Sequence, residues 1–201
     1  MNNFEKALLK HLTRSQLKKI QNKKIGIAGC GGLGSNIASI LVRSGFKDLE
    51  IIDFDIIEMN NLNRQNYFLA EVGKPKAETT AKRLRKINPD ISIKAINIKI
   101  DESNISQFFK DRDIIFEAFD KAELKKLFLE HFGNSGKLLI MGSGVGGTKN
   151  SSEIKIHKIN KNTFIVGDRI SGVNRKTPPL APRVIACAAL MASVALEEVL
   201  K

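Results

Sequence analysis

Short apolar runs alternate along this chain with longer segments in which apolar residues recur every three or four positions. The short runs are typical of buried strands, and the longer segments are typical of amphipathic helices. We expect strands at residues 24–28, 49–53, 92–98, 113–116 and 137–141, and helices at residues 35–43, 76–86, 104–109 and 122–132. Strands that alternate with helices of this length predict a parallel α/β sheet.

The two ends of the chain depart from this alternation. Residues 3–21 carry apolar side chains at helical spacing, which predicts an amphipathic N-terminal helix. After residue 147 the pattern predicts antiparallel strands at 153–159 and 163–166 and an alanine-rich closing helix at 183–200. We therefore expect a single domain over 1–201, made of an N-terminal helix (1–22), a core (23–147), and antiparallel strands with the closing helix (148–201).

A glycine-rich turn, GCGGLG, joins the first strand to the following helix. Its glycines (Gly29, Gly31, Gly32 and Gly34) permit positive φ and let backbone N–H groups approach a phosphate at a helix N-terminus. Asp53 ends the next strand, where its carboxylate can reach a ribose hydroxyl. The arrangement predicts a Rossmann-like nucleotide-binding fold, with a mostly parallel sheet flanked by helices and an antiparallel C-terminal extension. The turn suits NAD as well as ATP, and a tight turn without a ligand is the structural alternative.

The segment that follows the second strand, residues 53–65 (DFDIIEMNNLNRQ), favours ATP, because a NAD-binding domain has no need for so polar a segment. Asn61 and Arg64 fall at the carboxyl edge of the sheet, where open α/β sheets bind ligands. Lys76 begins the next helix, and Asp120 ends the fourth strand at the same edge. Two cations suit a triphosphate, and a carboxylate suits Mg²⁺, so Asp120 is the candidate metal ligand.

Each charged candidate also has a structural interpretation. Arg64 could pair with an acid at the surface, and Lys76 could be an ordinary solvated residue of a helix. Asp120 could cap the helix at 122–132. The three histidines share no pattern with one another or with a nucleophile.

The formal net charge of +12 raises the question of nucleic-acid binding. The lysines are spread along the chain and are not interleaved with aromatic residues, so we expect a solvated basic surface that favours nucleotides or acidic proteins. The two cysteines, Cys30 and Cys187, provide neither a disulfide framework nor a thiolate zinc site, so we expect no zinc. No apolar run is long enough to span a bilayer, and residues 1–21 lack a signal-peptide pattern, which predicts a cytoplasmic protein without a membrane partner.

Several motifs occur in order and together resemble the ThiF/MoeB/HesA group of the ubiquitin-activating-enzyme superfamily. They are GCGGLGS at 29–35, DFDxxExxNLNRQ at 53–65, GKPKAE at 73–78, INPD at 87–90 and the aspartate at 120. The resemblance runs from about residue 23 to residue 147. The later segment PLAPRVIA, at 179–186, is similar to the closing segment of the short, ThiF-like members.

The resemblance implies an ATP-dependent adenylyltransferase that activates the C-terminal glycine of a ubiquitin-like sulfur carrier ending in Gly-Gly and releases pyrophosphate. By position, the resemblance puts Gly32 under the nucleotide and Asp53 at the ribose. The phosphate contacts it implies are Asn61, Arg64 and Lys76, with Asp120 at Mg²⁺. Family members are commonly homodimers in which an N-terminal arginine reaches the neighbour's nucleotide, and Arg14 is the candidate here.

The short, ThiF-like pattern favours a ThiS-like carrier in thiamine biosynthesis. A MoaD-like carrier in molybdopterin biosynthesis, an NAD-dependent dehydrogenase and a non-enzymatic nucleotide-sensing module remain alternatives. The chain lacks the paired CxxC motifs of the longer members. Its cysteines lie in the glycine turn and in the closing helix, so the residues support adenylation rather than sulfur transfer.

Overall fold

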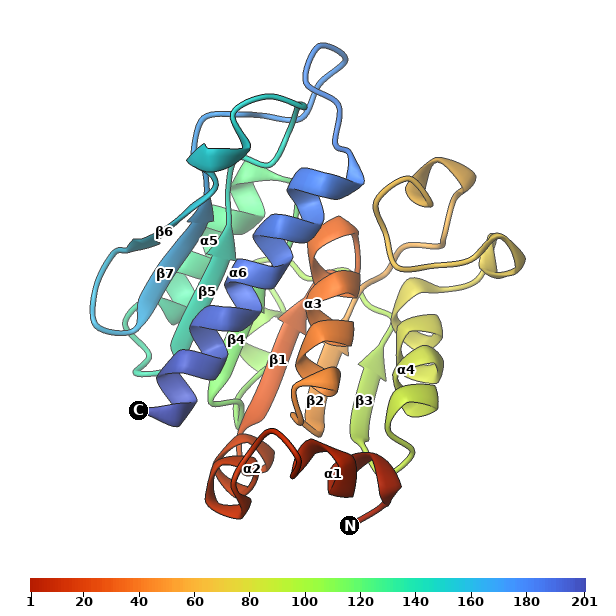
Figure 1. Ribbon diagram of the computed structural model, residues 1–201. Helices are drawn as coiled ribbons and strands as arrows, with labels where there is room; N and C mark the ends of the chain where they lie inside the picture. The colour runs from red at the N-terminus through yellow and green to blue at the C-terminus, as the bar shows by residue number, and fades with distance from the viewer.

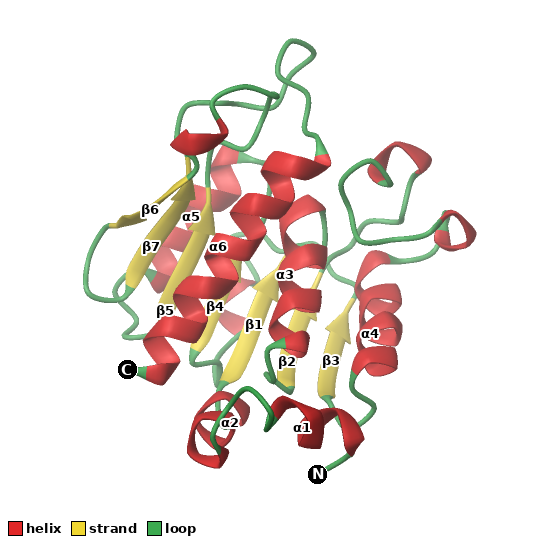
Figure 2. Ribbon diagram, viewed as in Figure 1, coloured by secondary structure: helices red, strands yellow, loops and turns green.

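The computed structural model describes residues 1–201 and contains one seven-stranded sheet in the order β3-β2-β1-β4-β5-β7-β6 (Figures 1 and 2). The strands are β1 Lys24–Ala28, β2 Asp48–Ile52, β3 Ser92–Ile96, β4 Ile114–Glu117, β5 Leu138–Gly142, β6 Lys155–Lys158 and β7 Thr163–Gly167. All neighbouring pairs are parallel except β6 with β7. The predicted Rossmann-like α/β class, with a mostly parallel sheet and an antiparallel extension, is therefore confirmed.

Helices cover both faces of the sheet. Figure 1 shows α3 (Gly32–Arg43), α4 (Lys76–Ile87) and α6 (Ala181–Leu200) on one face, with α5 (Ala122–Phe132) on the other. The larger apolar cluster joins α3, α4 and α6 to the strands, and the smaller one lies under α5. Near-continuous burial of β1, β2, β4 and β5 follows from this two-sided cover, since parallel strands are buried on both faces.

The N-terminal segment differs from the single helix that its spacing predicts. It forms two short helices, α1 (Asn3–Leu8) and α2 (Arg14–Gln21), which lie beyond the amino ends of the parallel strands (Figure 1). The second helix starts with a capping box, in which the Thr13 side chain accepts from the backbone of Gln16 and the Gln16 side chain accepts from the backbone of Thr13. This reciprocal pair fixes a helix start in the middle of the apolar repeat.

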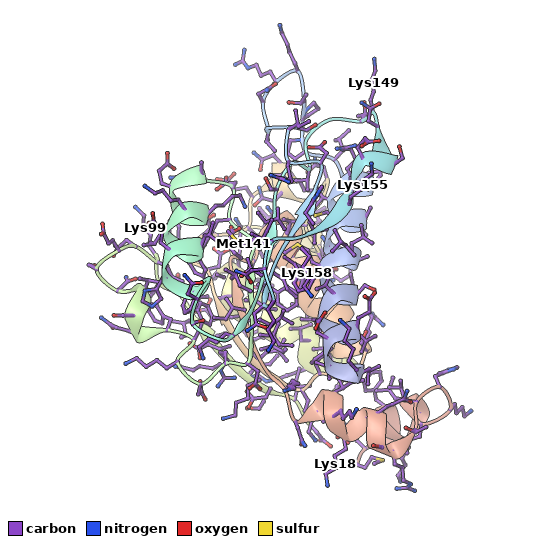
Figure 3. The ribbon with its side chains drawn as sticks, turned by 90° about the vertical axis from the view of Figure 1, so that its left-hand side faces the viewer. Lys18, Lys99, Met141, Lys149, Lys155 and Lys158 are labelled. Carbon is purple, nitrogen blue, oxygen red and sulfur yellow. The ribbon has the colours of Figure 1, made fainter.

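Two other predicted elements are modified. The helix expected at 104–109 is only a 3-10 turn, Ile105–Gln107, because the backbone of Phe108 is extended and Phe109 follows with a positive φ of 56°. The C-terminal extension is antiparallel only at its edge, since β7 pairs in parallel with β5. Figure 3 looks onto this edge of the sheet, where the exposed Lys155 and Lys158 mark β6. None of the helices is long and apolar enough to cross a membrane.

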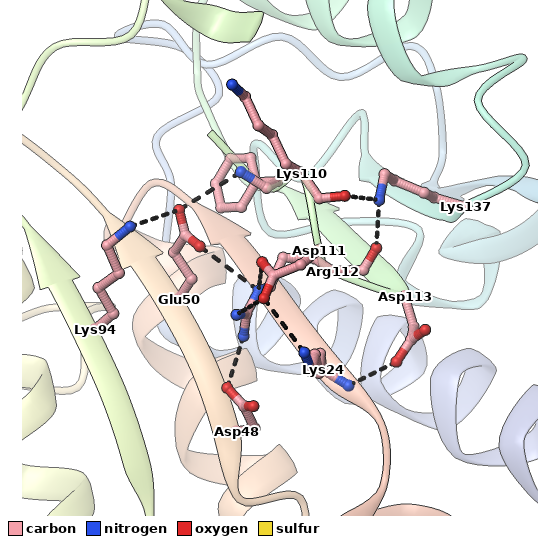
Figure 4. A network of polar contacts seen from close by, with 10 residues as sticks. Lys24, Asp48, Glu50, Lys94, Lys110, Asp111, Arg112, Asp113 and Lys137 are labelled. Atoms are coloured by element: carbon pink, nitrogen blue, oxygen red, sulfur yellow. Dashed lines mark hydrogen bonds and ion pairs between the residues drawn. The ribbon is translucent and has the colours of Figure 1, made fainter. Parts of the chain in front are cut away.

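At the amino ends of the strands the charged residues form a closed set that we call the amino-end network (Figure 4). Arg112 lies at its centre and donates to Asp48 at 2.6 Å and to both oxygens of Asp111 at 2.9 and 2.8 Å. Glu50, which is 3% exposed, lies 3.5 Å from the same guanidinium. Lys24 joins Asp111 at 3.4 Å. Because each of these three acids has a cation partner within the set, we interpret this end of the sheet as structural.

The strand order reverses between β1 and β4, because β2 and β3 extend the sheet on one side and β5 extends it on the other. In open α/β sheets the crevice outside the carboxyl ends of the strands at such a reversal binds ligands. The glycine turn follows β1, and residues 118–121 follow β4, so this crevice receives both segments.

Candidate nucleotide-binding site

A pocket of about 670 Å³ occupies the crevice at the carboxyl ends of the strands. Nearly all of the site residues that the sequence suggests line it: Gly29, Gly31, Gly32, Asp53, Asn61, Arg64, Lys76 and Asp120. Two do not. Gly34 is buried behind the turn, and Arg14 begins α2 at the opposite end of the sheet (Figure 1).

The glycine turn presents the start of α3 to the pocket. Gly31 caps this helix without any side-chain hydrogen bond, so the N–H groups of the first turn are available to an anion. Gly29 has a φ of 93°, and a Cβ on Gly34 would overlap the carbonyl oxygen of Gly29. Gly34 is therefore needed to close the turn and does not contact the ligand space. A Cβ on Gly32 would come within 2.9 Å of Val184, which shows how tightly this floor of the pocket is packed.

The Asp53 carboxylate holds the glycine turn and its own loop together. One oxygen accepts from the backbone of Cys30 at 2.6 Å and the other accepts from the backbone of Asp55 at 2.7 Å. Burial raises the pKa of Asp53, against the lowering effect of these two hydrogen bonds. Each carboxylate oxygen keeps a free lone pair for a ribose hydroxyl. Asp53 thus braces the site in addition to lining it, a role that the sequence did not reveal.

The contacts of Arg64 and Lys76 differ from those of a surface ion-pair residue and of a solvated helix residue, which are the structural interpretations of these two cations. The Arg64 guanidinium donates to the carbonyl of Asn60 at 3.1 Å and to the side chain of Asn63 at 2.8 Å, which are both neutral acceptors. Burial lowers the pKa of Arg64, while the charge of Asp120 acts in the opposite direction. Lys76 is 6% exposed and pairs with Asp55 at 2.9 Å. Arg64 is therefore not a surface ion-pair residue, and Lys76 is not an ordinary solvated residue.

Asn61 is also buried, at 6% exposed, and its side chain accepts from the backbone of Glu58 at 3.2 Å. The neighbouring Gln65 is 8% exposed, and its side-chain oxygen has no hydrogen-bond partner. Buried polar atoms are nearly always paired, so an orphaned atom in a pocket points to a ligand that pairs with it. Gln65 ends the motif at 53–65, but nothing in the local sequence marks it as a pocket residue.

Asp120 is exposed in the pocket wall, three residues beyond the end of β4. The cap of α5 is Lys121, and no side chain bonds the first turn of that helix, so the proposed capping role of Asp120 is wrong. No group of three or more His, Cys, Asp or Glu side chains is arranged to hold a metal ion. A Mg²⁺ site here would need ligands from phosphates and water besides one carboxylate, which is the usual arrangement for this ion.

The far wall of the pocket comes from the C-terminal third of the chain, which sequence reasoning left without site residues. Ser143 and Ser171 belong to two loops that line it. Asp168 joins these loops: it accepts from the backbone and hydroxyl of Ser171 at 2.7 and 2.6 Å, and it pairs with the buried Arg183. Arg183 also donates to the carbonyl oxygen of Asn150 at 2.9 Å. The bonds of Asp168 and Arg183 therefore hold the two loops in place.

Neither cysteine faces the pocket as a reactive thiol. Cys30 and Cys187 are both fully buried. Burial raises the pKa of the Cys187 thiol to about 12, and it raises that of Cys30 further. A thiol of this kind is a poor nucleophile at neutral pH.

An open helix N-terminus, two inward cations and an unpaired carboxylate at a strand-order reversal together define a nucleotide-binding α/β protein. The particular family follows from comparison with known proteins. The family model described as "ThiF family" matches residues 5–201, and the chain therefore belongs to the ThiF family.

Curated relatives match over part of their length. The chain is 30% identical over 139 residues to the molybdopterin-synthase adenylyltransferase of Haemophilus influenzae, which covers 69% of this chain and 57% of that protein. It is 32% identical over 132 residues to the sulfur carrier protein ThiS adenylyltransferase of Bacillus subtilis, covering 64% and 39%. It is 41% identical over 104 residues to the NEDD8-activating enzyme E1 catalytic subunit of Arabidopsis thaliana, covering 51% and 23%. The matches thus span less than two thirds of these relatives.

Solved structures agree over a longer stretch. The tRNA N6-threonylcarbamoyladenosine dehydratase TcdA of E. coli, in complex with AMP, superposes with a TM-score of 0.87 over 96% of this chain and 92% of that one, at 20% identity. E. coli MccB, in a complex with AMPCPP, superposes with a TM-score of 0.75 over 92% of this chain and 57% of that one, at 25% identity. These likenesses establish the fold.

Proposed function

We propose that this protein binds ATP in the pocket and transfers AMP to the C-terminal glycine carboxylate of a ubiquitin-like carrier protein. The observation that supports this most is the gathering of Arg64, Lys76 and Asp120 around the glycine turn in one pocket. Membership of the ThiF family and the names of two matching adenylyltransferases support the same reaction.

The proposed roles follow from the position and charge of each side chain. The first turn of α3, at Gly31 and Gly32, receives a phosphate, and Asp53 accepts from a ribose hydroxyl. Arg64, Lys76 and Asn61 contact the other phosphates. When Mg²⁺ is bound, it would be held by Asp120 together with phosphate oxygens and would neutralise part of their charge.

In the proposed reaction a carrier carboxylate oxygen forms a bond to the α-phosphorus of ATP, and the bond to the bridging oxygen of pyrophosphate breaks. The products are an acyl-adenylate and pyrophosphate. The attacking carboxylate is ionised at neutral pH, so no general base is needed. The chain contributes alignment and charge neutralisation, which is consistent with a pocket that has cations and an acid but no histidine.

We propose a ThiS-like carrier of thiamine biosynthesis as the partner, because the closing segment resembles the short ThiF-like members. A MoaD-like carrier is the second candidate, favoured by the match to a molybdopterin-synthase adenylyltransferase over 69% of this chain. The decisive experiment is exchange of labelled pyrophosphate into ATP with each carrier in turn. Exchange with one carrier identifies it, whereas no exchange with any Gly-Gly carrier, together with tight NAD binding, contradicts adenylation and favours a dehydrogenase.

The proposal includes a homodimer in which Arg14 of one copy acts at the pocket of the other. Within one chain Arg14 is exposed and lies at the opposite end of the sheet from its own pocket. Mixing inactive Arg14→Ala and Lys76→Ala chains would restore some exchange activity if each copy completes its neighbour's site. A strictly monomeric sedimentation profile, or no recovery on mixing, contradicts this part.

A further inference from the structure

Glu117 is a buried acid directly before the pocket-lining residues 118–120, and the proposed function does not use it. It is the last residue of β4 and has no exposed surface. One of its oxygens accepts from the backbone of Phe119 at 2.8 Å. A carboxylate buried in this way is costly unless a cation and hydrogen bonds compensate for the lost water.

Lys125, on the first turns of α5, supplies that compensation. Its ammonium group donates to both oxygens of Glu117 at 3.0 Å and to the carbonyl oxygen of Gly142 at 2.7 Å. These three bonds use all of its N–H donors. The side chain lines the pocket and is 24% exposed. One ammonium group therefore joins the end of β4, the end of β5 and the start of α5.

The pair brackets the segment that carries Asp120. On one side Phe119 is fixed to Glu117 through its N–H, and on the other side Lys125 fixes α5 to the same carboxylate. Asp120 itself has no hydrogen bond that would hold its backbone in place, and the first turn of α5 has no side-chain cap. The same buried carboxylate therefore holds the chain on both sides of Asp120.

A buried ion pair is weak evidence for stability, since apolar side chains of similar size often stabilise as well or better. What apolar side chains could not do here is hold a backbone N–H and a backbone carbonyl at the pocket wall. We propose that Glu117 and Lys125 are positioning residues that aim Asp120 into the nucleotide pocket. The inference rests on the proposed function for its effect on turnover, but its effect on local structure can be tested without it.

The experiment compares Lys125→Met with Lys125→Arg, which keeps the charge, and with Arg112→Met, which removes the central cation of the amino-end network. Two quantities are measured for each variant: hydrogen exchange of residues 117–122, and kcat and KM for ATP in carrier-dependent pyrophosphate exchange. We expect Lys125→Met to speed hydrogen exchange in residues 117–122. It should also lower kcat about tenfold or more with a smaller change in KM, because small misplacement of reacting groups is costly. Lys125→Arg should retain most of both properties.

Arg112→Met should destabilise the protein globally. The rate of hydrogen exchange in residues 117–122, compared with the rest of the chain, should stay as in the wild type. If Lys125→Met fails to fold, the double variant E117Q/K125M removes both charges and should show the same loss of kcat. If Lys125→Met folds and its hydrogen exchange in residues 117–122 is unchanged, the positioning role is overturned, even if no carrier supports turnover. A kcat within about threefold of the wild type overturns it where turnover is measured.

Discussion

The two ends of the sheet each hold an arginine near acids, but they differ in how that arginine is bonded. At the amino end, Arg112 directs its donors at Asp48 and Asp111, with Glu50 also nearby. At the carboxyl end, Arg64 bonds only to neutral oxygens, and Asp120 forms no ion pair. Both ends combine arginine and acids, so the residue types alone do not separate them. The difference teaches that unsatisfied polar groups in a pocket, rather than the number of charges, mark where a ligand binds.

Replacing Asp120 by Asn should have the largest effect, because it removes the free charge of the carboxyl end. We expect kcat for pyrophosphate exchange to fall about 100-fold or more, the range found when one group that stabilises a transition state is lost. Thermal stability should stay near the wild-type value, because Asp120 caps no helix. A fully active Asp120→Asn protein would show that this carboxylate has no role in the reaction.

Replacing Arg112 by Met tests the other end. The change leaves the buried Glu50 with Lys94, at 3.9 Å, as its remaining cation, and breaking a buried ion pair costs about 3 kcal/mol. For a chain of this size that corresponds to a fall in Tm of roughly 9 °C. The KM for ATP should not change, because none of these residues lines the pocket. A selective loss of ATP binding in a stable Arg112→Met protein would contradict the purely structural role of the amino end.

Replacing Gly32 by Ala tests how closely the floor of the pocket is packed. The added methyl group would approach Val184 to 2.9 Å and the Arg64 side chain to 3.5 Å. We expect the KM for ATP to rise about tenfold, which is 1.4 kcal/mol of binding. Gly172→Ala is the matched comparison, because Gly172 also lines the pocket but a Cβ there would have no protein atom within 4 Å. Equal KM values for the two variants would argue against close packing at Gly32.

The smallest effect concerns pH. The hydrogen bonds from Arg112 hold the pKa of Asp111 at about 2, below its value in an unfolded chain of about 3.9. An acid with a lowered pKa contributes stability above its unfolded pKa and loses it as the pH falls through the folded pKa. The wild type should therefore melt slightly above Asp111→Asn at pH 7, and the difference should disappear near pH 2. A difference that grows on acidification contradicts this pairing.

At the carboxyl end of the sheet, the contribution of Asp53 to stability should depend on pH in the opposite direction. Burial raises the pKa of Asp53, so this acid takes up its proton more readily in the folded protein than in the unfolded one. Its contribution to stability is therefore greatest at low pH and declines as the pH rises through the folded pKa. Comparing the melting temperatures of the wild type and Asp53→Asn across pH 3–7 measures this trend.

Local signals in the sequence predicted most of the fold and most of the pocket. The glycine turn, the polar run after β2 and the alternation of strands and helices are all short-range patterns, and the structure places them together at one edge of the sheet. The break between α1 and α2 also had a local signal, because Thr13 and Gln16 have the spacing of a capping box. The apolar repeat that runs across this break obscured it.

Long-range contacts account for what the sequence did not predict. The parallel pairing of β7 with β5 depends on the path of the chain through residues 143–162, and no local pattern specifies it. The bond from Cys30 to Asp53 joins residues 23 positions apart, and the bond from Lys125 to the carbonyl oxygen of Gly142 joins residues 17 positions apart. Each of these contacts requires the sheet to be assembled before its partners can be recognised.

The exposed lysines of β6 have a consequence for how this protein behaves in solution. An edge strand presents free N–H and C=O groups with which another chain could pair, and charged side chains along it oppose such pairing. Lys155 and Lys158 (Figure 3) point to opposite faces of β6. At the other edge of the sheet, Lys94 is exposed on β3. Part of the basic surface therefore protects the protein against aggregation by strand addition, at both open edges of its sheet.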